Sequence, residues 1–86
     1  MKHAGPAAVD RLEPLLVQIR PLPGLVEKRR GVFYRKGKAF LHFHEDPAGL
    51  FADVRFEGTE FTRVRVETVD EQAALFAHLA SFATRS

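Results

Sequence analysis

His42 and His44, two histidines separated by one residue, have the type and spacing that best fit a chemical role in this sequence. Apolar and polar residues alternate around them, which is typical of a β-strand. Alternate residues of a strand point to the same face, so both imidazoles lie on one side at a spacing that can chelate a metal ion. The pattern therefore indicates a candidate metal site.

Asp53 is the third member of this candidate site. If residues 46–49 form a four-residue turn, His42 pairs with Asp53 on the next strand, where the carboxylate serves as a ligand or orients an imidazole. The alternative without a metal is a hydrogen bond between His42 and Asp53, with His44 packed on Phe51. The sequence favours this alternative, so no cofactor is expected. The competing hypothesis is a small-ligand or metal-binding domain, in which His42, His44 and Asp53 bind a small ligand, zinc or another divalent metal.

A second group of candidate residues combines arginine with phenylalanine on the same expected sheet face. Single-stranded nucleic acid fits such a face, because bases stack on aromatic rings while arginine holds phosphate. A homodimer fits it as well, because both residue types are enriched at interface centres. A solvated face with an Asp53–Arg65 pair is the simplest alternative. The group consists of Phe33, Arg35, Phe40, Phe51, Arg55, Arg63 and Arg65.

Composition narrows these hypotheses. Thirteen basic residues nearly balance eleven acidic ones, so the chain lacks the strong basic excess that favours nucleic acid. There is no cysteine, which excludes disulfides, thiolate metal sites and cysteine nucleophiles. No nucleophile elbow or glycine-rich phosphate loop is present, so the sequence gives little support to an enzyme. A self-associating binding or assembly module, most simply a homodimer, is the expected function.

The elements that must position these residues begin and end with helices. Apolar residues at helical spacing predict a helix over residues 10–19, with a capping box at Asp10 and Glu13. A second helix begins with the capping box Thr68–Glu71 and continues to the end of the chain. Four strands are expected between them, at residues 26–35, 38–45, 50–57 and 61–67, joined by turns at 36–37, 46–49 and 58–60.

Folding these strands into a meander gives a two-layer α-β-β-β-β-α domain of the α+β class, with both helices on one face of a four-stranded antiparallel sheet. The register pairs Phe33 with Phe40, and Asp53 with Arg65. The expected helix-covered face is nearly all apolar. It carries Val32, Tyr34, Ala39, Leu41, Phe43, Ala52, Val54, Phe56, Val64 and Val66. The opposite face carries the candidate residues and is expected to be uncovered.

Two segments resemble known families. Residues 22–27, followed by Gly37-Lys38-Ala39-Phe40 and the turn at 46–50, resemble small bacterial YjbR/MmcQ-like domains. That resemblance implies a helix–sheet–helix fold and a DNA-binding-like module without an agreed activity. Residues 40–50, with an H-x-H motif before a turn, resemble a luciferase-associated domain. Each resemblance covers roughly residues 22–57, and neither implies catalytic residues.

The 86 residues are expected to form a single domain with residues 1–9 flexible. No stretch reaches the roughly 20 apolar residues of a membrane span, and the first residues lack the apolar region of a signal peptide. We therefore expect a bacterial cytoplasmic protein without a membrane partner.

Overall fold

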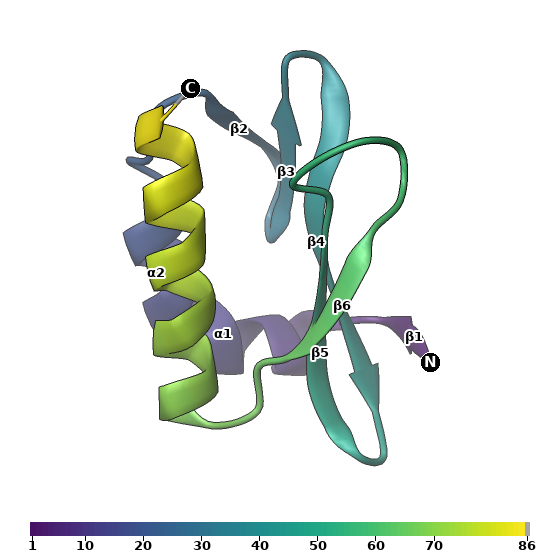
Figure 1. The fold of residues 1–86 in the computed structure, drawn as a ribbon. Helices are drawn as coiled ribbons and strands as arrows, with labels where there is room; N and C mark the ends of the chain where they lie inside the picture. The colour runs from purple at the N-terminus through teal and green to yellow at the C-terminus, as the bar shows by residue number, and fades with distance from the viewer. Residues whose placement is uncertain (86) are drawn as a thin grey trace.

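An antiparallel sheet and two helices make up the α+β fold of residues 1–85, the part of the chain that this computed structural model describes (Figure 1). The elements in chain order are β1 (Lys2–His3), α1 (Pro6–Ile19), β2 (Leu25–Arg29), β3 (Val32–Arg35), β4 (Lys38–Asp46), β5 (Gly49–Val54), β6 (Thr62–Arg65) and α2 (Val69–Arg85).

The sheet has six strands rather than the four that the sequence predicts. The strands β2 to β6 lie in chain order, and β1 pairs with β4 on the side away from β5. The predicted strand over 26–35 is divided into β2 and β3 by a turn at Gly31, whose positive φ of 82° suits glycine. The predicted order of the strands is therefore right, and the predicted number of strands is wrong.

Two predicted turns are confirmed. Lys36 and Gly37 both have positive φ, 53° and 78°, as a tight two-residue hairpin turn requires. The turn between β4 and β5 pairs Glu45 with Leu50 and His42 with Asp53, as the sequence register predicts. The central hairpin of the sheet could therefore be derived from turn chemistry alone.

The predicted register between β3 and β4 is wrong because β4 contains a bulge. Phe33 pairs with Leu41 and Tyr34 pairs with Ala39, so Phe40 is the extra residue. The bulge places Phe33 and Phe40 in the core, where they are 1% and 3% exposed. Both were expected on the opposite face, and Val32, Tyr34 and Ala39 correspondingly do not belong to the buried core.

The connection between β5 and β6 is longer than predicted. The strand β5 ends at Val54 and β6 begins at Thr62, so the connecting loop spans residues 55–61 rather than 58–60. As a result Asp53 pairs with Arg63, and Arg65 pairs with Phe51. The expected pair of Asp53 with Arg65 is wrong by two residues, which preserves the face on which both arginines lie.

The first helix begins earlier than the capping pattern indicates. Pro6 is its first residue and Gly5 is its N-cap, so Asp10 and Glu13 lie inside α1. Both of these carboxylates bind Arg30 instead of capping the helix. At α2 the prediction is confirmed, because the Thr68 Oγ1 accepts from the Glu71 amide at 3.1 Å and Glu71 accepts from the Thr68 amide at 2.9 Å.

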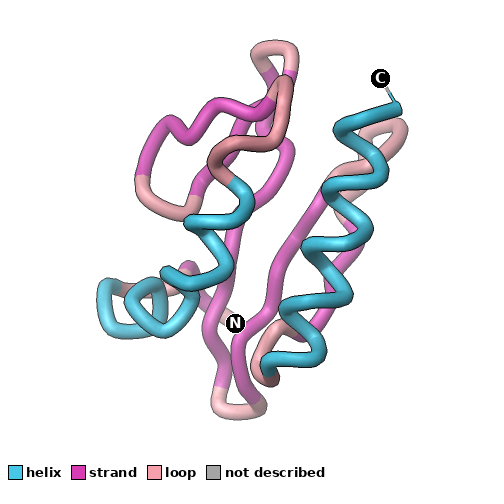
Figure 2. Tube along the Cα trace, turned by 90° about the vertical axis from the view of Figure 1, so that its left-hand side faces the viewer, coloured by secondary structure: helices cyan, strands magenta, loops and turns pink. Residues whose placement is uncertain are grey.

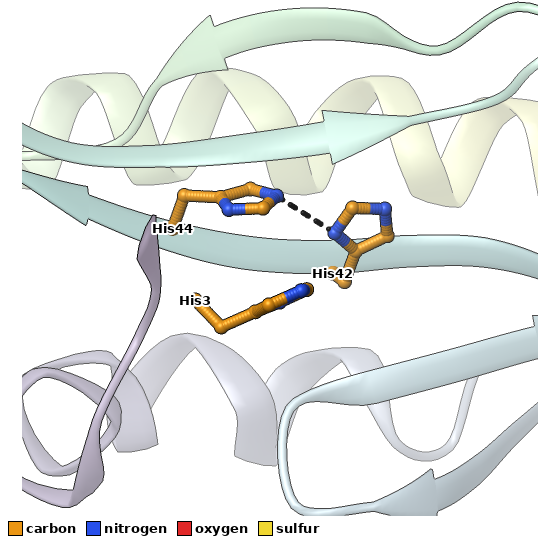
Figure 3. Close-up of side chains that lie close together, drawn as sticks. All are labelled: His3, His42 and His44. Carbon is orange, nitrogen blue, oxygen red and sulfur yellow. Dashed lines mark hydrogen bonds between the residues drawn. The ribbon is translucent and has the colours of Figure 1, made fainter. Parts of the chain in front are cut away.

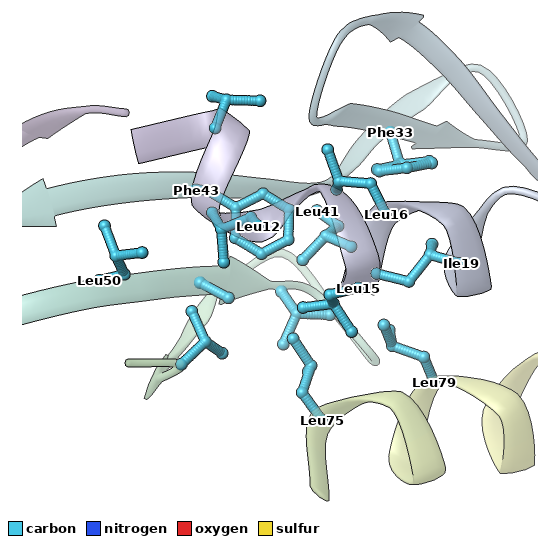
Figure 4. Packing of buried hydrophobic residues seen from close by; sticks show 14 of the residues in the cluster. Leu12, Leu15, Leu16, Ile19, Phe33, Leu41, Phe43, Leu50, Leu75 and Leu79 are labelled. Carbon is cyan, nitrogen blue, oxygen red and sulfur yellow. The ribbon is translucent and has the colours of Figure 1, made fainter. Parts of the chain in front are cut away.

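The core joins the two helices and the sheet in a single cluster (Figure 4). Leu12, Leu16 and Ile19 of α1 and Leu79 of α2 are at most 1% exposed and pack with Leu41 of β4. Both helices are on the viewer's side of the sheet in Figure 2, but α2 runs along the strands whereas α1 runs across them in Figure 1. Neither helix among residues 1–85 is long and apolar enough to span a membrane.

Candidate functional site

The strand β4 positions two of the three histidines of the candidate site. His42 and His44 alternate with Phe43, which is 4% exposed and belongs to the core, so both imidazoles point to the opposite face. Because β4 is the central strand, with β5 on one side and β3 and β1 on the other, the backbone beneath these imidazoles is held from both sides. The His-x-His prediction is confirmed in its geometry.

The third histidine, His3, comes from the short strand β1 and was not predicted. It pairs with His44 on β4, and its ring centroid lies 4.7 Å from that of His44 and 5.8 Å from that of His42. Two hydrogen bonds hold this part of the chain against β4: the Ala4 amide donates to the Phe43 carbonyl, and the Gly5 amide donates to the Glu45 carboxylate. The segment expected to be flexible therefore supplies a residue of the site.

One ring nitrogen from each of His3, His42 and His44 lies within 4.8 Å of the others (Figure 3). The closest approach is 2.9 Å, between Nε2 of His44 and Nδ1 of His42. Two ligands of a tetrahedral zinc ion, each at 2.0–2.1 Å from the metal, lie about 3.3 Å apart. The rings of His42 and His44 are therefore about as close as two ligands of one ion. Coordination through Nδ1 of His44 would need its imidazole to turn, because Nε2 is the atom that faces His42 here.

Asp53 contacts His44 rather than His42. Its carboxylate oxygen Oδ2 lies 3.0 Å from Nε2 of His44, and both of its oxygens accept hydrogen bonds of 2.7 Å from Arg63. The hydrogen bonds from Arg63 lower the pKa of Asp53, although burial opposes them, so the carboxylate is ionised at neutral pH. Nε2 of His44 also lies 2.9 Å from Nδ1 of His42, and the ionised carboxylate beside it favours a proton on Nε2.

Because Nε2 faces both Asp53 and Nδ1 of His42, Nδ1 of His44 is left without a partner among the described residues. His44 is only 9% exposed, so an unpaired nitrogen there costs about 1–3 kcal/mol. In metalloproteins a carboxylate that holds one nitrogen of a histidine commonly leaves the other as the metal ligand. With both of its oxygens bound to Arg63, Asp53 fits this orienting role better than the role of third ligand.

The environment of His42 favours the neutral form of its imidazole. Burial lowers its pKa below the ordinary value of 6.5, and the nearby His44 lowers it further, while Asp53 opposes the shift. A neutral imidazole keeps the lone pair that a metal ligand needs. At neutral pH the imidazole of His42 is therefore neutral and keeps this lone pair.

The surroundings of the cluster differ on its two sides. The loop after β5 places the Phe61 ring against His42, with the centroids 4.9 Å apart, and the Arg55 guanidinium lies 5.0 Å from the centroid of the same ring. Next to His3, a groove of about 350 Å³ opens between the start of α1 and the turn between β2 and β3. His3 is the exposed histidine of the three, so a molecule in solution would reach the cluster from the His3 side.

The remaining predicted site residues do not form one surface. Phe33 and Phe40 are in the core, and Arg35 lies over the Phe82 ring of α2, on the helix-covered face. Phe51 and Arg65 stay on the opposite face, where Arg65 binds Glu71. Two of the three phenylalanines expected on the opposite face therefore lie in the core. The homodimer and nucleic-acid hypotheses that rest on this face stay predictions.

No protein-family model matches this sequence, and neither curated proteins nor solved structures give a match. The two family resemblances therefore stay predictions, and the site's own geometry is the basis for assigning a function.

Proposed function

We propose that this chain is a small metal-binding domain in which His3, His42 and His44 together hold a transition-metal ion such as Zn²⁺. The observation that carries this proposal is the convergence of three imidazoles from two strands, with donor nitrogens within 4.8 Å. Support also comes from Nδ1 of His44, which is buried and has no hydrogen-bond partner in residues 1–85, and from the Asp53 carboxylate, which lies 3.0 Å from the other ring nitrogen.

The donor set favours particular metals. Imidazole is a borderline ligand that suits zinc, copper, nickel and iron, whereas magnesium and calcium prefer oxygen ligands. Three histidines leave the fourth position of a tetrahedral ion for a water molecule or an external ligand. His3 is exposed, so such a ligand would enter beside it.

A metal ion at this position would cross-link β1 to the centre of the sheet, because His3 is near the start of the chain and His42 and His44 are on β4. An 86-residue domain buries a modest fraction of its surface, and small domains often depend on a metal or another cross-link. Binding to the folded state alone raises the free energy of unfolding in proportion to the logarithm of the metal concentration. The ion would therefore stabilise the domain as well as recruit a ligand.

The test is a zinc titration of the full chain by calorimetry, with Co²⁺ absorption as a second readout of tetrahedral nitrogen coordination. His3→Ala is the sharpest variant, because His3 is exposed and the domain should fold without it. We expect its zinc affinity to fall at least about tenfold. His78→Gln removes the fourth histidine, which stacks on Phe56 of the loop after β5 outside the cluster, and should bind zinc as the wild type does.

A wild-type chain without measurable binding at micromolar zinc would refute the proposal. Equal loss of affinity in His3→Ala and His78→Gln would refute the assigned site, because it would show that zinc binds histidines without regard to their position.

A further inference from the structure

Some basic residues of this domain form ion pairs with carboxylates, and others do not. Arg11, Arg20, Arg30, Arg63 and Arg65 each bind a carboxylate. Four other cations line a single hollow of about 240 Å³ at the turn between β3 and β4. None of these four has a carboxylate oxygen within 4.0 Å of its charged nitrogens in residues 1–85. They are Arg35, Lys36, Lys38 and Arg55.

The hairpin turn forces two of these cations together. Arg35 and Lys38 are direct cross-strand partners, and Lys36 lies between them in the turn. Like charges directly opposite one another destabilise a strand pair. Glu57 is the only acidic residue lining the hollow, so the repulsion is not balanced within the described chain.

Aromatic rings hold the two arginines in place. The Arg35 guanidinium lies 4.7 Å from the centroid of the Phe82 ring, and the Arg55 guanidinium lies 5.0 Å from that of Phe61. Arg55 also donates to the carbonyl of Ala39. A guanidinium has five N–H donors in one plane, so stacking fixes its position and leaves most of its donors for a ligand. Each guanidinium is therefore held in place before binding, Arg35 from the helix-covered face and Arg55 from the face of the histidine cluster, at the end of the sheet where the hollow opens.

We propose that this hollow binds a phosphoryl group. A phosphate monoester carries a charge of about −1.5 to −2 and three strong acceptor oxygens, which match two arginines and two lysines better than a single carboxylate does. Binding would also relieve the repulsion between Arg35 and Lys38. No residue of the hollow belongs to the histidine cluster, although the Phe61 ring contacts both Arg55 of the hollow and His42 of the cluster.

The experiment measures thermal unfolding and calorimetric binding of the full chain in a chelator-containing buffer, so that the histidine cluster has no part in the result. The probes are inorganic phosphate, adenosine monophosphate and a ten-residue oligothymidylate. Sodium chloride and sodium acetate at the same ionic strength are the reference salts. We expect phosphate to raise the unfolding midpoint above that in either reference salt.

The variants separate this site from general charge effects. Lys36→Asn with Lys38→Gln removes two exposed cations, and asparagine tolerates the positive φ at position 36. We expect this double variant to bind phosphate at least fivefold more weakly. Lys28→Gln with Arg29→Gln removes the same charge from β2, outside the hollow, and should bind as the wild type does. Glu57→Gln should bind more tightly.

The probes also distinguish the sources of the phosphoryl group. Binding of adenosine monophosphate without the oligonucleotide would identify a small phosphorylated ligand. Oligonucleotide binding that weakens steeply with salt and is lost in the double variant would identify a nucleic-acid backbone. Absence of binding by all three probes, or equal losses in the two double variants, would overturn the proposal.

Discussion

The imidazole of His44 reaches diagonally across β4 and β5 to Asp53, with Nε2 lying 3.0 Å from the carboxylate oxygen Oδ2. The residue directly opposite Asp53 in the register is His42, so simple cross-strand pairing gives the wrong partner. The contact connects the histidine cluster to Arg63, which holds the other side of the same carboxylate.

Asp53→Asn is expected to weaken zinc binding by about ten- to a hundredfold, because the neutral amide no longer holds the Nε2 proton of His44 as an ionised carboxylate does. Competition with a coloured zinc chelator measures the change. Glu60→Gln, a loss of charge at an exposed residue of the loop after β5, is the matched control. Unchanged affinity in Asp53→Asn would show that the carboxylate has no role in orienting the ligand.

The stability of the metal-free domain should decrease as the pH falls from about 7 to 5. The pKa of His42 is lower in the folded state than the ordinary 6.5, so the unfolded chain binds more protons in this interval. The free energy of unfolding therefore rises with pH there. Urea unfolding at several pH values, in the presence of a chelator, measures the slope. His42→Gln should flatten it, and an unchanged slope would contradict this origin.

Phe40→Asp should unfold the domain rather than dissociate an oligomer. Phe40 is 3% exposed and packs against Phe56 and Phe82, with ring centroids 6.1 and 5.7 Å away. Replacing a buried phenylalanine with a much smaller residue costs about 3–5 kcal/mol, and burying a carboxylate adds to this. Circular dichroism and urea unfolding provide the measurement. Phe51→Asp, on the opposite face, should keep the fold, whereas a folded Phe40→Asp protein would contradict the bulge.

Thr68→Ala should lower the free energy of unfolding by about 1 kcal/mol, because it removes the side-chain acceptor for the Glu71 amide at the start of α2. Thr68→Ser keeps this acceptor and should restore most of the loss. Chemical denaturation of the three proteins side by side is sufficient, and equal stability of the alanine and serine variants would exclude the cap as the cause.

The sequence predicted those parts of the fold that depend on local chemistry. The turn at Lys36 and Gly37 and the capping box at Thr68 follow from the conformational preferences of single residues, and both are present. The pairing of His42 with Asp53 followed from a turn of the right length. Local signals were thus enough to place two histidines and one carboxylate on the same face.

The rest depended on long-range contacts that no local pattern records. The bulge at Phe40 follows from packing against Phe82 and Phe56, and it reversed the expected faces of β3. His3 joins the site only because β1 pairs with the distant β4. Two strand residues are too few for a periodicity signal, and the histidine composition alone could have suggested His3 as a third ligand.

The short length of β1 also determines how quickly a bound metal ion could leave the histidine cluster. One of three donors is on a two-residue strand at the sheet edge, whereas the other two are on the central strand. Such an end opens locally at a much lower free energy than that of global unfolding. An ion held by the three histidines would therefore leave through opening of β1 while the rest of the domain stays folded, so the rate of release would be set by the stability of this strand.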